Sequence, residues 1–265
     1  MATGSRTEWA RFDGRTQLKR YLVVISIVAS GVALFYTMDL RTEYILDAHV
    51  HIYDLFSRML PPDVSILPSL VQPTIETFHM SVLATVFAAG LSVPLAFLAA
   101  ENTSPNRFVW WLSRTLIALF RSVHDIIWAL LFILLLGPGA VAGLLGMAFK
   151  SIGFIGKFFA EEIEEIDRNK VRAIRATGAG SLHVVVYSIV PQIKAAFVGL
   201  TVYRWDVNVR AGTIVGLVGA GGIGMELSRA TGRLLWTEAA TILLVIFGLV
   251  IASEVISASL RERVR

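Results

Sequence analysis

The chain has 265 residues, of which 55% are hydrophobic and 17% charged, with a mean hydropathy of +0.67. This apolar share exceeds that of a soluble domain, and apolar runs near twenty residues predict an all-α integral membrane protein rather than a membrane barrel. The absence of cysteine excludes disulfides, thiol catalysis and thiolate metal sites. The modest net charge of +4 is concentrated at termini and loops, which indicates membrane orientation rather than nucleic-acid binding.

The N-terminal region combines a basic tail with an apolar run. Residues 1–20 are polar and basic, so we expect a cytoplasmic tail, and residues 21–38 are interpreted as an uncleaved first span. Residues 39–73 carry more acidic than basic side chains and an amphipathic stretch, which predicts an interfacial segment on the outer side. His49 and His51 fall on different faces of a helix there, so no metal site is expected.

Two further apolar segments follow, joined by a short turn expected in the cytoplasm. Residues 74–100 are predicted to form the second span, and residues 107–136 the third. A helix over 107–136 would measure about 45 Å, more than the bilayer core requires, so it must bend or project. Within it, a basic stripe of residues seven apart (Arg107, Arg114 and Arg121) either faces the cytosol or lines an anion path, with Asp125 as a possible partner of Arg121.

The fourth and fifth spans are predicted at 140–160 and from Ser181 onward. In the fifth, Arg204, Asp206, Asn208 and Arg210 fall close together within an otherwise membrane-compatible helix. A charge at the bilayer centre costs about 2.5 to 3.5 kcal/mol, so these side chains cannot face lipid. Arg204 and Asn208 share one helical face, and Asp206 can pair with Arg210 on the other. They are interpreted either as lining an anion path or as a structural network between helices.

A glycine-rich segment then precedes the last span, predicted at 237–260. It contains Gly219, Gly221, Gly222 and Gly224, which match a dinucleotide-binding spacing. Spanning segments flank this motif, so we expect close packing or a bent turn near an outer gate. No Walker motif is present, and the chain cannot hydrolyse ATP alone. The basic tail at 261–265 places both termini of a six-span protein in the cytoplasm.

The segment 168–191 combines a short amphipathic helix with glycine stops. Asp167 or Asn169 can cap its start, Val171 and Ile174 share one face, and glycines end it before Ser181, a candidate cap for the next helix. We expect this helix to lie at the cytoplasmic interface and to present its apolar face to a protein partner.

This segment resembles the EAA loop of binding-protein-dependent ABC importer permeases, because Ala173, Gly178 and Pro191 fall at the family's spacings. The run 201–224 narrows the resemblance to the phosphonate-transport permeases, over roughly 74–260. Arg172 stands where the family has glutamate, and nearby carboxylates within the loop 161–181 are possible substitutes. The resemblance implies ATPase-coupling residues at Arg168, Val171, Arg172, Ala173, Ile174, Arg175 and Gly178.

The resemblance also implies a type I permease fold in the bacterial inner membrane, with a homodimer as the transport path. The implied partners are a pair of ATPase subunits, which hold ATP and Mg, and an external phosphonate-binding protein. This chain itself would have no cofactor and no catalytic group, and phosphate or phosphite are alternative cargoes. A second hypothesis is an ion-gradient carrier that uses His124, Asp125 and Asp206 as a proton relay. A membrane enzyme has less support, since no catalytic constellation stands out.

Overall fold

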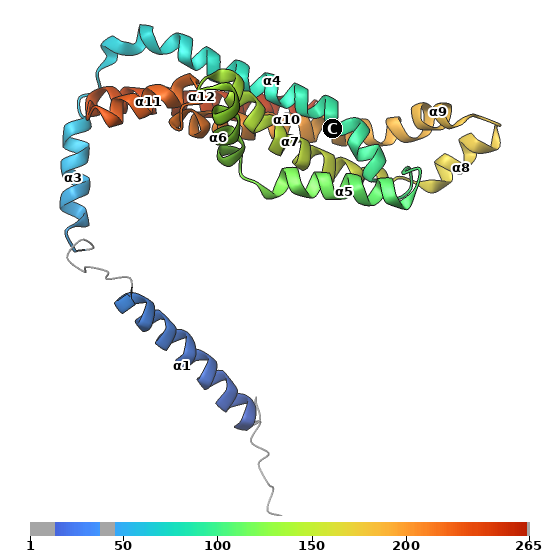
Figure 1. The fold of residues 1–265 in the computed structure, drawn as a ribbon, viewed down its shortest axis with the longest axis horizontal. Coiled ribbons are helices and arrows are strands. Elements are labelled where there is room, and N and C mark those ends of the chain that lie inside the picture. Colours follow the sequence, from blue (N-terminus) through green and yellow to red (C-terminus); the bar gives the residue numbers. More distant parts are fainter. Residues whose placement is uncertain (1–13, 38–45, 264–265) are drawn as a thin grey trace, which may run out of the picture. The chain divides into compact units, whose positions relative to one another are not determined.

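A computed structural model describes residues 14–37 and 46–263, which are helical apart from short turns (Figure 1). Residues 1–13 of the predicted tail, residue 38 at the end of the predicted first span, residues 39–45 of the outer segment and the last two residues lie outside this description. The chain divides into two units, 1–56 and 57–265. The first contains α1 (Gly14–Thr37) and most of α3 (Ala48–Met59). α1 starts within the predicted tail, and its length and apolar composition suit a membrane span.

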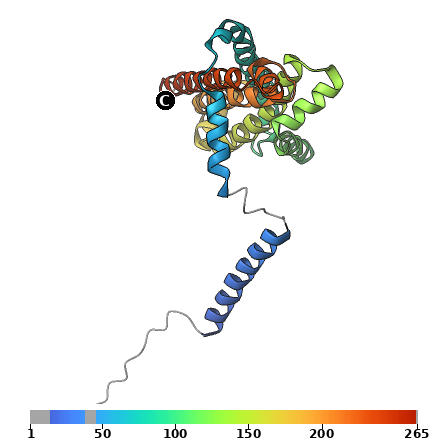
Figure 2. The same cartoon turned by 90° about the vertical axis from the view of Figure 1, so that its left-hand side faces the viewer.

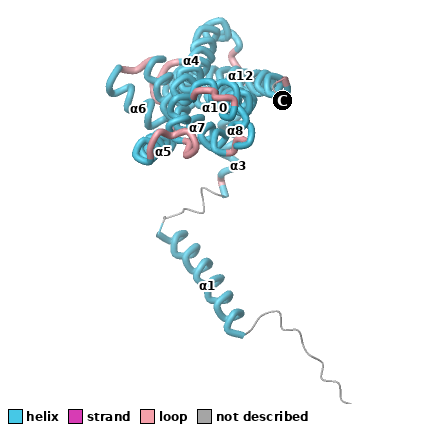
Figure 3. Tube along the Cα trace, turned by 90° about the vertical axis from the view of Figure 1, so that its right-hand side faces the viewer, coloured by secondary structure: helices cyan, strands magenta, loops and turns pink. Residues whose placement is uncertain are grey.

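The second unit is a bundle of long helices with α8 and α9 at one end and α11 at the other (Figure 1). Figure 2 views the bundle from the α11 end, and Figure 3 from the α8 end. Its helical elements are η1 (Val64–Ile66), α4 (Leu67–Ala99), α5 (Arg107–Ser122), α6 (Asp125–Leu136), α7 (Ala140–Glu164), α8 (Arg168–Ala176), α9 (Ser181–Val184), η2 (Val185–Ile189), α10 (Val190–Leu217), α11 (Gly222–Gly232) and α12 (Trp236–Glu262). The described helices provide five spans, or six if the bent pair α5–α6 counts as one, which agrees with the predicted six-span, all-α fold.

Within the bundle, α5 and α6 pack closely against glycines of α7. A Cβ atom at Gly146 would lie 2.7 Å from Ala129 Cα on α6, and one at Gly153 would lie 2.6 Å from the Arg121 nitrogen. Since real Cβ contacts are not this short, both helices approach the α7 backbone as closely as glycine allows. The buried faces of α4 and α7 pack against each other along the bundle.

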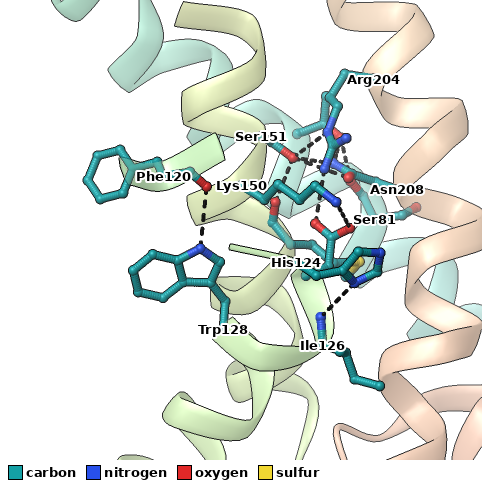
Figure 4. Close-up of polar contacts among 12 residues, drawn as sticks. Ser81, Phe120, His124, Ile126, Trp128, Lys150, Ser151, Arg204 and Asn208 are labelled. Atoms are coloured by element: carbon teal, nitrogen blue, oxygen red, sulfur yellow. Dashed lines mark hydrogen bonds and ion pairs between the residues drawn. The ribbon is translucent and has the colours of Figure 1, made fainter. Parts of the chain in front are cut away.

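The third predicted span bends sharply, which is one of the two outcomes expected from its excess length. α5 and α6 meet at an angle of 91°. Val123 and His124 are extended, so the helix stops without proline or glycine, and the His124 ring accepts a hydrogen bond from the Ile126 N–H at 3.5 Å. The Trp128 indole donates to the Phe120 carbonyl at 3.4 Å across the bend (Figure 4). The bend places Asp125 in the first turn of α6.

The start of the fifth span differs from the prediction at one residue. Gly180, not Ser181, is the N-cap of α9, and it makes no side-chain cap hydrogen bond, so Ser181 becomes the first helical residue. The helix then widens into the π-helical η2 just before Pro191. Proline lacks an N–H and its ring crowds the preceding turn, and a wider turn relieves both problems while the helix continues.

Candidate functional site

The polar residues predicted on the fifth span lie in α10, within the helical bundle. Arg204, Asp206 and Asn208 are buried, whereas the Arg210 side chain is 41% exposed. The predicted faces agree with the contacts, because Arg204 and Asn208 meet α4, α6 and α7, while Asp206 and Arg210 pair with each other. The two faces therefore belong to separate polar networks.

Arg204 is neutralised by a carboxylate from the bent helix pair. Its Nη2 donates to Asp125 Oδ1 at 3.1 Å and its Nε donates to Ser151 Oγ at 2.8 Å (Figure 4). The guanidinium carbon also lies 5.4 Å from the centre of the Phe154 ring. Asp125 thus pairs with Arg204 rather than with the predicted Arg121, which lies on the far side of the bend.

Lys150 is the second cation at Asp125, and the sequence reasoning missed it. Its Nζ lies 3.2 Å from Asp125 Oδ2, and its side chain is 21% exposed. A lysine in the middle of an apolar span was a visible signal, because ionisable residues at membrane depth are costly and mark functional or paired sites. Asp125 therefore stands between a buried guanidinium and a more accessible ammonium group.

Asn208 connects α10 to α4 and α7. Its Nδ2 donates to Thr85 Oγ1 at 2.8 Å and to Ser151 Oγ at 3.1 Å. On the opposite face, Asp206 accepts a hydrogen bond from Ser253 Oγ of α12 at 2.9 Å and pairs with Arg210 one turn along. Buried polar groups that are satisfied in this way hold helices at a fixed register.

A cavity of about 210 Å³ opens beside these networks. It is lined by two cations, Lys150 and Arg210, by His124 and Asp125, and by the apolar side chains of Ile126, Val207, Ala211, Ile214 and Val215. One water molecule needs about 10–15 Å³, so the volume of this cavity is many times larger. Arg204 and Asn208 do not line it, and Arg121 lines a different cavity. The networks contain three cations, Lys150, Arg204 and Arg210, against two carboxylates, so the region carries an excess positive charge.

The glycine segment forms the tight turn between α10 and α11. Gly219, Gly221 and Gly222 have φ values of +98°, +80° and +67°, which favour glycine. A Cβ at Gly222 would collide with Thr77 Oγ1, which accepts a hydrogen bond from the Ile223 N–H at 2.8 Å. Gly224 likewise lies directly against the backbone of Thr213. These glycines let the backbone of the turn contact the Thr77 side chain of α4 and bring the backbones of α10 and α11 together.

The predicted coupling segment forms α8 at one end of the bundle (Figure 3). Asp167 caps it by accepting from the Asn169 N–H at 2.9 Å, and Gly178, with φ of +80°, follows its end. Val171 packs against a buried cluster that includes Ile189 of η2. The helix otherwise presents exposed basic side chains, and Arg168, Arg172 and Arg175 line a cavity of about 640 Å³ together with the α4–α5 loop, Val171 and α9.

Several known proteins are similar to this chain in sequence. The family model for the binding-protein-dependent transport system inner membrane component matches residues 92–265. The phosphite transport system permease protein PtxC of Stutzerimonas stutzeri is 37% identical over 246 residues, covering 93% of this chain and 89% of that protein. The phosphate-import permease protein PhnE of Mycolicibacterium smegmatis is 37% identical over 227 residues, covering 86% of this chain and 43% of that protein.

A solved structure shows the same fold at low sequence identity. A chain of the MetNI methionine ABC transporter, crystallised in inward facing conformations, aligns with a TM-score of 0.67 and 20% identity over 77% of this chain and 99% of that chain. The ion-gradient carrier is not supported by these relatives, and the family is a transport component rather than an enzyme. The chain belongs to the family of inner membrane components of binding-protein-dependent transport systems, the permeases of ABC importers.

Proposed function

We propose that this chain forms the membrane path of an ATP-driven importer for phosphorus oxyanions, either phosphonate, phosphite or phosphate. The names of the relatives in Stutzerimonas stutzeri and Mycolicibacterium smegmatis support this cargo class. Two copies of the chain enclose the path, an ATPase pair that holds ATP and Mg binds at the α8 end, and an external binding protein delivers cargo at the α11 end. Both termini lie in the cytoplasm.

The observation that carries the proposal is the cavity lined by Lys150 and Arg210 within the spanning helices. A guanidinium offers paired N–H donors that match a phosphorus oxyanion, and an ammonium adds a compact charge. Each cation already has a carboxylate partner, Asp125 or Asp206. An entering oxyanion competes with these carboxylates for the same donors, so binding is weak and the cargo can leave. Arg204 and Asn208 hold the helices behind this surface.

Energy enters through α8. The Asp167 N–H donates to Gln192 Oε1 of α10 at 3.0 Å, and Val171 packs against the buried cluster that includes Ile189 of η2, so α8 is attached to η2 and the beginning of α10. An ATPase that displaces α8 therefore pulls on the helix that carries Arg210. The exposed arginines of α8 can pair with carboxylates on the ATPase, in the place of the family glutamate that Arg172 replaces. This is alternating access driven from one end of the bundle.

The test is uptake of labelled phosphite and phosphate into proteoliposomes that contain the whole transporter, with ATP inside and the binding protein outside. Arg210→Gln is expected to lower uptake about tenfold, the equivalent of one charge-assisted hydrogen bond of about 1.5 kcal/mol. Arg210→Lys keeps the charge and is expected to retain part of the activity. Arg263→Gln, at the exposed end of α12, is the control. Normal uptake by a correctly assembled Arg210→Gln transporter would reject this path.

A further inference from the structure

Another basic cavity lies between α5 and α7. It has a volume of about 140 Å³ and is lined by Ala99, Arg114, Ile117, Ala118, Arg121, Lys157, Ala160 and Glu161. None of these residues lines the cavity of Lys150 and Arg210. Lys150 and Lys157 are seven residues apart on α7, nearly two full turns, so they share one helical face about 10 Å apart. The basic cavity therefore continues the cationic face of α7 toward the α8 end.

Arg114 is held in a fixed orientation at this cavity. Its Nη2 donates to both carboxylate oxygens of Glu164, at 2.7 and 2.8 Å, and its Nε donates to the Ala99 carbonyl at 3.0 Å. The guanidinium carbon lies 5.0 Å from the centre of the Trp110 ring. These contacts use Nε and Nη2, so Nη1 is left to bind another acceptor. A guanidinium oriented in advance loses little freedom when a ligand arrives.

The charges of the cavity do not balance. Lys157 pairs with Glu161 at 3.2 Å, and Arg114 pairs with Glu164. Within the described part of the chain, Arg121 has neither a hydrogen-bond partner nor an ion-pair partner for its side chain. The end of α5 offsets part of its charge, but a helix terminus amounts to only about half an elementary charge. One guanidinium is therefore available to an anion.

We propose that the cavity of Arg114, Arg121 and Lys157 is a binding site for a phosphorus oxyanion, distinct from the path at Arg210. Small side chains at Ala118 and Ala160 provide the space, and guanidinium groups provide donors that match phosphate oxygens. This chemistry fits the phosphate of an anionic phospholipid or a free oxyanion. Basic pockets between spanning helices bind anionic head groups in membrane proteins. The free-oxyanion case rests on the proposed function, whereas the lipid case does not.

The experiment measures binding to the whole transporter in nanodiscs. In one arm, nanodiscs contain phosphatidylcholine with or without phosphatidylglycerol, and native mass spectrometry counts the phosphatidylglycerol retained per chain. In the other arm, nanodiscs contain phosphatidylcholine alone, and equilibrium dialysis measures bound labelled inorganic phosphate. Arg121→Gln removes the unpaired cation, and Ala118→Leu fills the cavity without changing its charge. Arg107→Gln is the matched control, since Arg107 lies on the same stripe of α5 but does not line the cavity.

We expect the wild type to retain one of the two ligands and both test variants to lose it by about tenfold, with Arg107→Gln unchanged. Loss in the first arm identifies a lipid head group, and loss in the second identifies a free oxyanion. The proposal is overturned if the wild type binds neither ligand, or if Arg121→Gln binds both as the wild type does. Phosphate binding that is sensitive to Arg210→Gln but not to Arg121→Gln excludes the free oxyanion at this cavity; if phosphatidylglycerol retention is also unchanged in Arg121→Gln, the proposal is overturned and the proposed function stays intact.

Discussion

The carboxylate of Asp125 neutralises two cations at once, so Asp125→Asn is predicted to destabilise the protein more than Arg204→Met does. The Asp125 oxygens lie 3.1 Å from Arg204 Nη2 and 3.2 Å from Lys150 Nζ. Asparagine removes the charge and leaves Arg204, only 3% exposed, without its counter-ion. Breaking a buried pair in this way costs about 3–5 kcal/mol, because the remaining charge stays in a medium that solvates it poorly.

Arg204→Met is expected to cost less, about 1–3 kcal/mol. Asp125 keeps Lys150 as its counter-ion, so no buried charge is left alone, and the loss is mainly that of hydrogen bonds to Asp125 and Ser151. The double variant Asp125→Asn/Arg204→Met removes both buried charges, and Lys150 can turn toward its cavity. Its loss of stability is therefore expected to be close to that of Arg204→Met alone, and well below the sum of the two single losses.

The assay is the free energy of unfolding of the full chain in mixed micelles, measured by titration with SDS and followed by circular dichroism. Glu262→Gln, at the exposed end of α12, is the control and is expected to change stability by less than about 0.5 kcal/mol. Additive losses in the double variant, or an Asp125→Asn cost below about 1 kcal/mol, would refute the shared counter-ion.

Two further predictions concern glycines. Gly222→Ala is expected to lower the free energy of unfolding by about 2–3 kcal/mol in the same titration, because the new Cβ collides with Thr77 Oγ1 and the residue has a positive φ. The control Gly232→Ala places its Cβ in open space and is expected to have little effect. Gly178→Val is expected to abolish ATP-dependent uptake while the chain still inserts and folds. No atom lies within 4 Å of the added Cβ, so packing is not disturbed, whereas the φ of +80° that ends α8 is unfavourable for valine. Uptake and micelle stability measured on the same preparation would separate the two effects, and normal uptake with Gly178→Val would contradict coupling through α8.

Features that depend only on residues close together in the sequence could be predicted from it. Asp206 and Arg210 are one turn apart on a helix, so their pairing needed no knowledge of the tertiary structure. The same holds for the Asp167 cap. The excess length of 107–136 required a bend or a projecting end, but it did not indicate where a bend would fall. The break at Val123 and His124 has neither proline nor glycine, so no local signal marked it.

The site itself required the fold. Arg204 and Asp125 are 79 residues apart and meet only because α5 and α6 bend and pack on α7. The sequence left open whether the polar residues of α10 form a path or a structural network, and the structure adds which of them line the cavity. Arg204 and Asn208 bond to neighbouring helices, while Arg210, which pairs with Asp206 on its own helix, reaches the cavity. Lys150 was identifiable from its depth in an apolar span, but its partner was not.

The polar contacts make α10 the helix through which motion at one end can reach the cavity. It is tied to α6 through Asp125, to α4 and α7 through Asn208, and to α12 through Ser253. It is also continuous with α9 through the π-helical turn before Pro191, next to the place where α8 packs. A π turn can relax toward α-helical geometry, which rotates everything that follows it. Such a rotation would move Arg210 relative to Lys150 on α7 while the pairs Asp206–Arg210 and Lys150–Asp125 stay intact. It would also require the contacts of Arg204 and Asn208 with neighbouring helices to yield, so these contacts resist the motion.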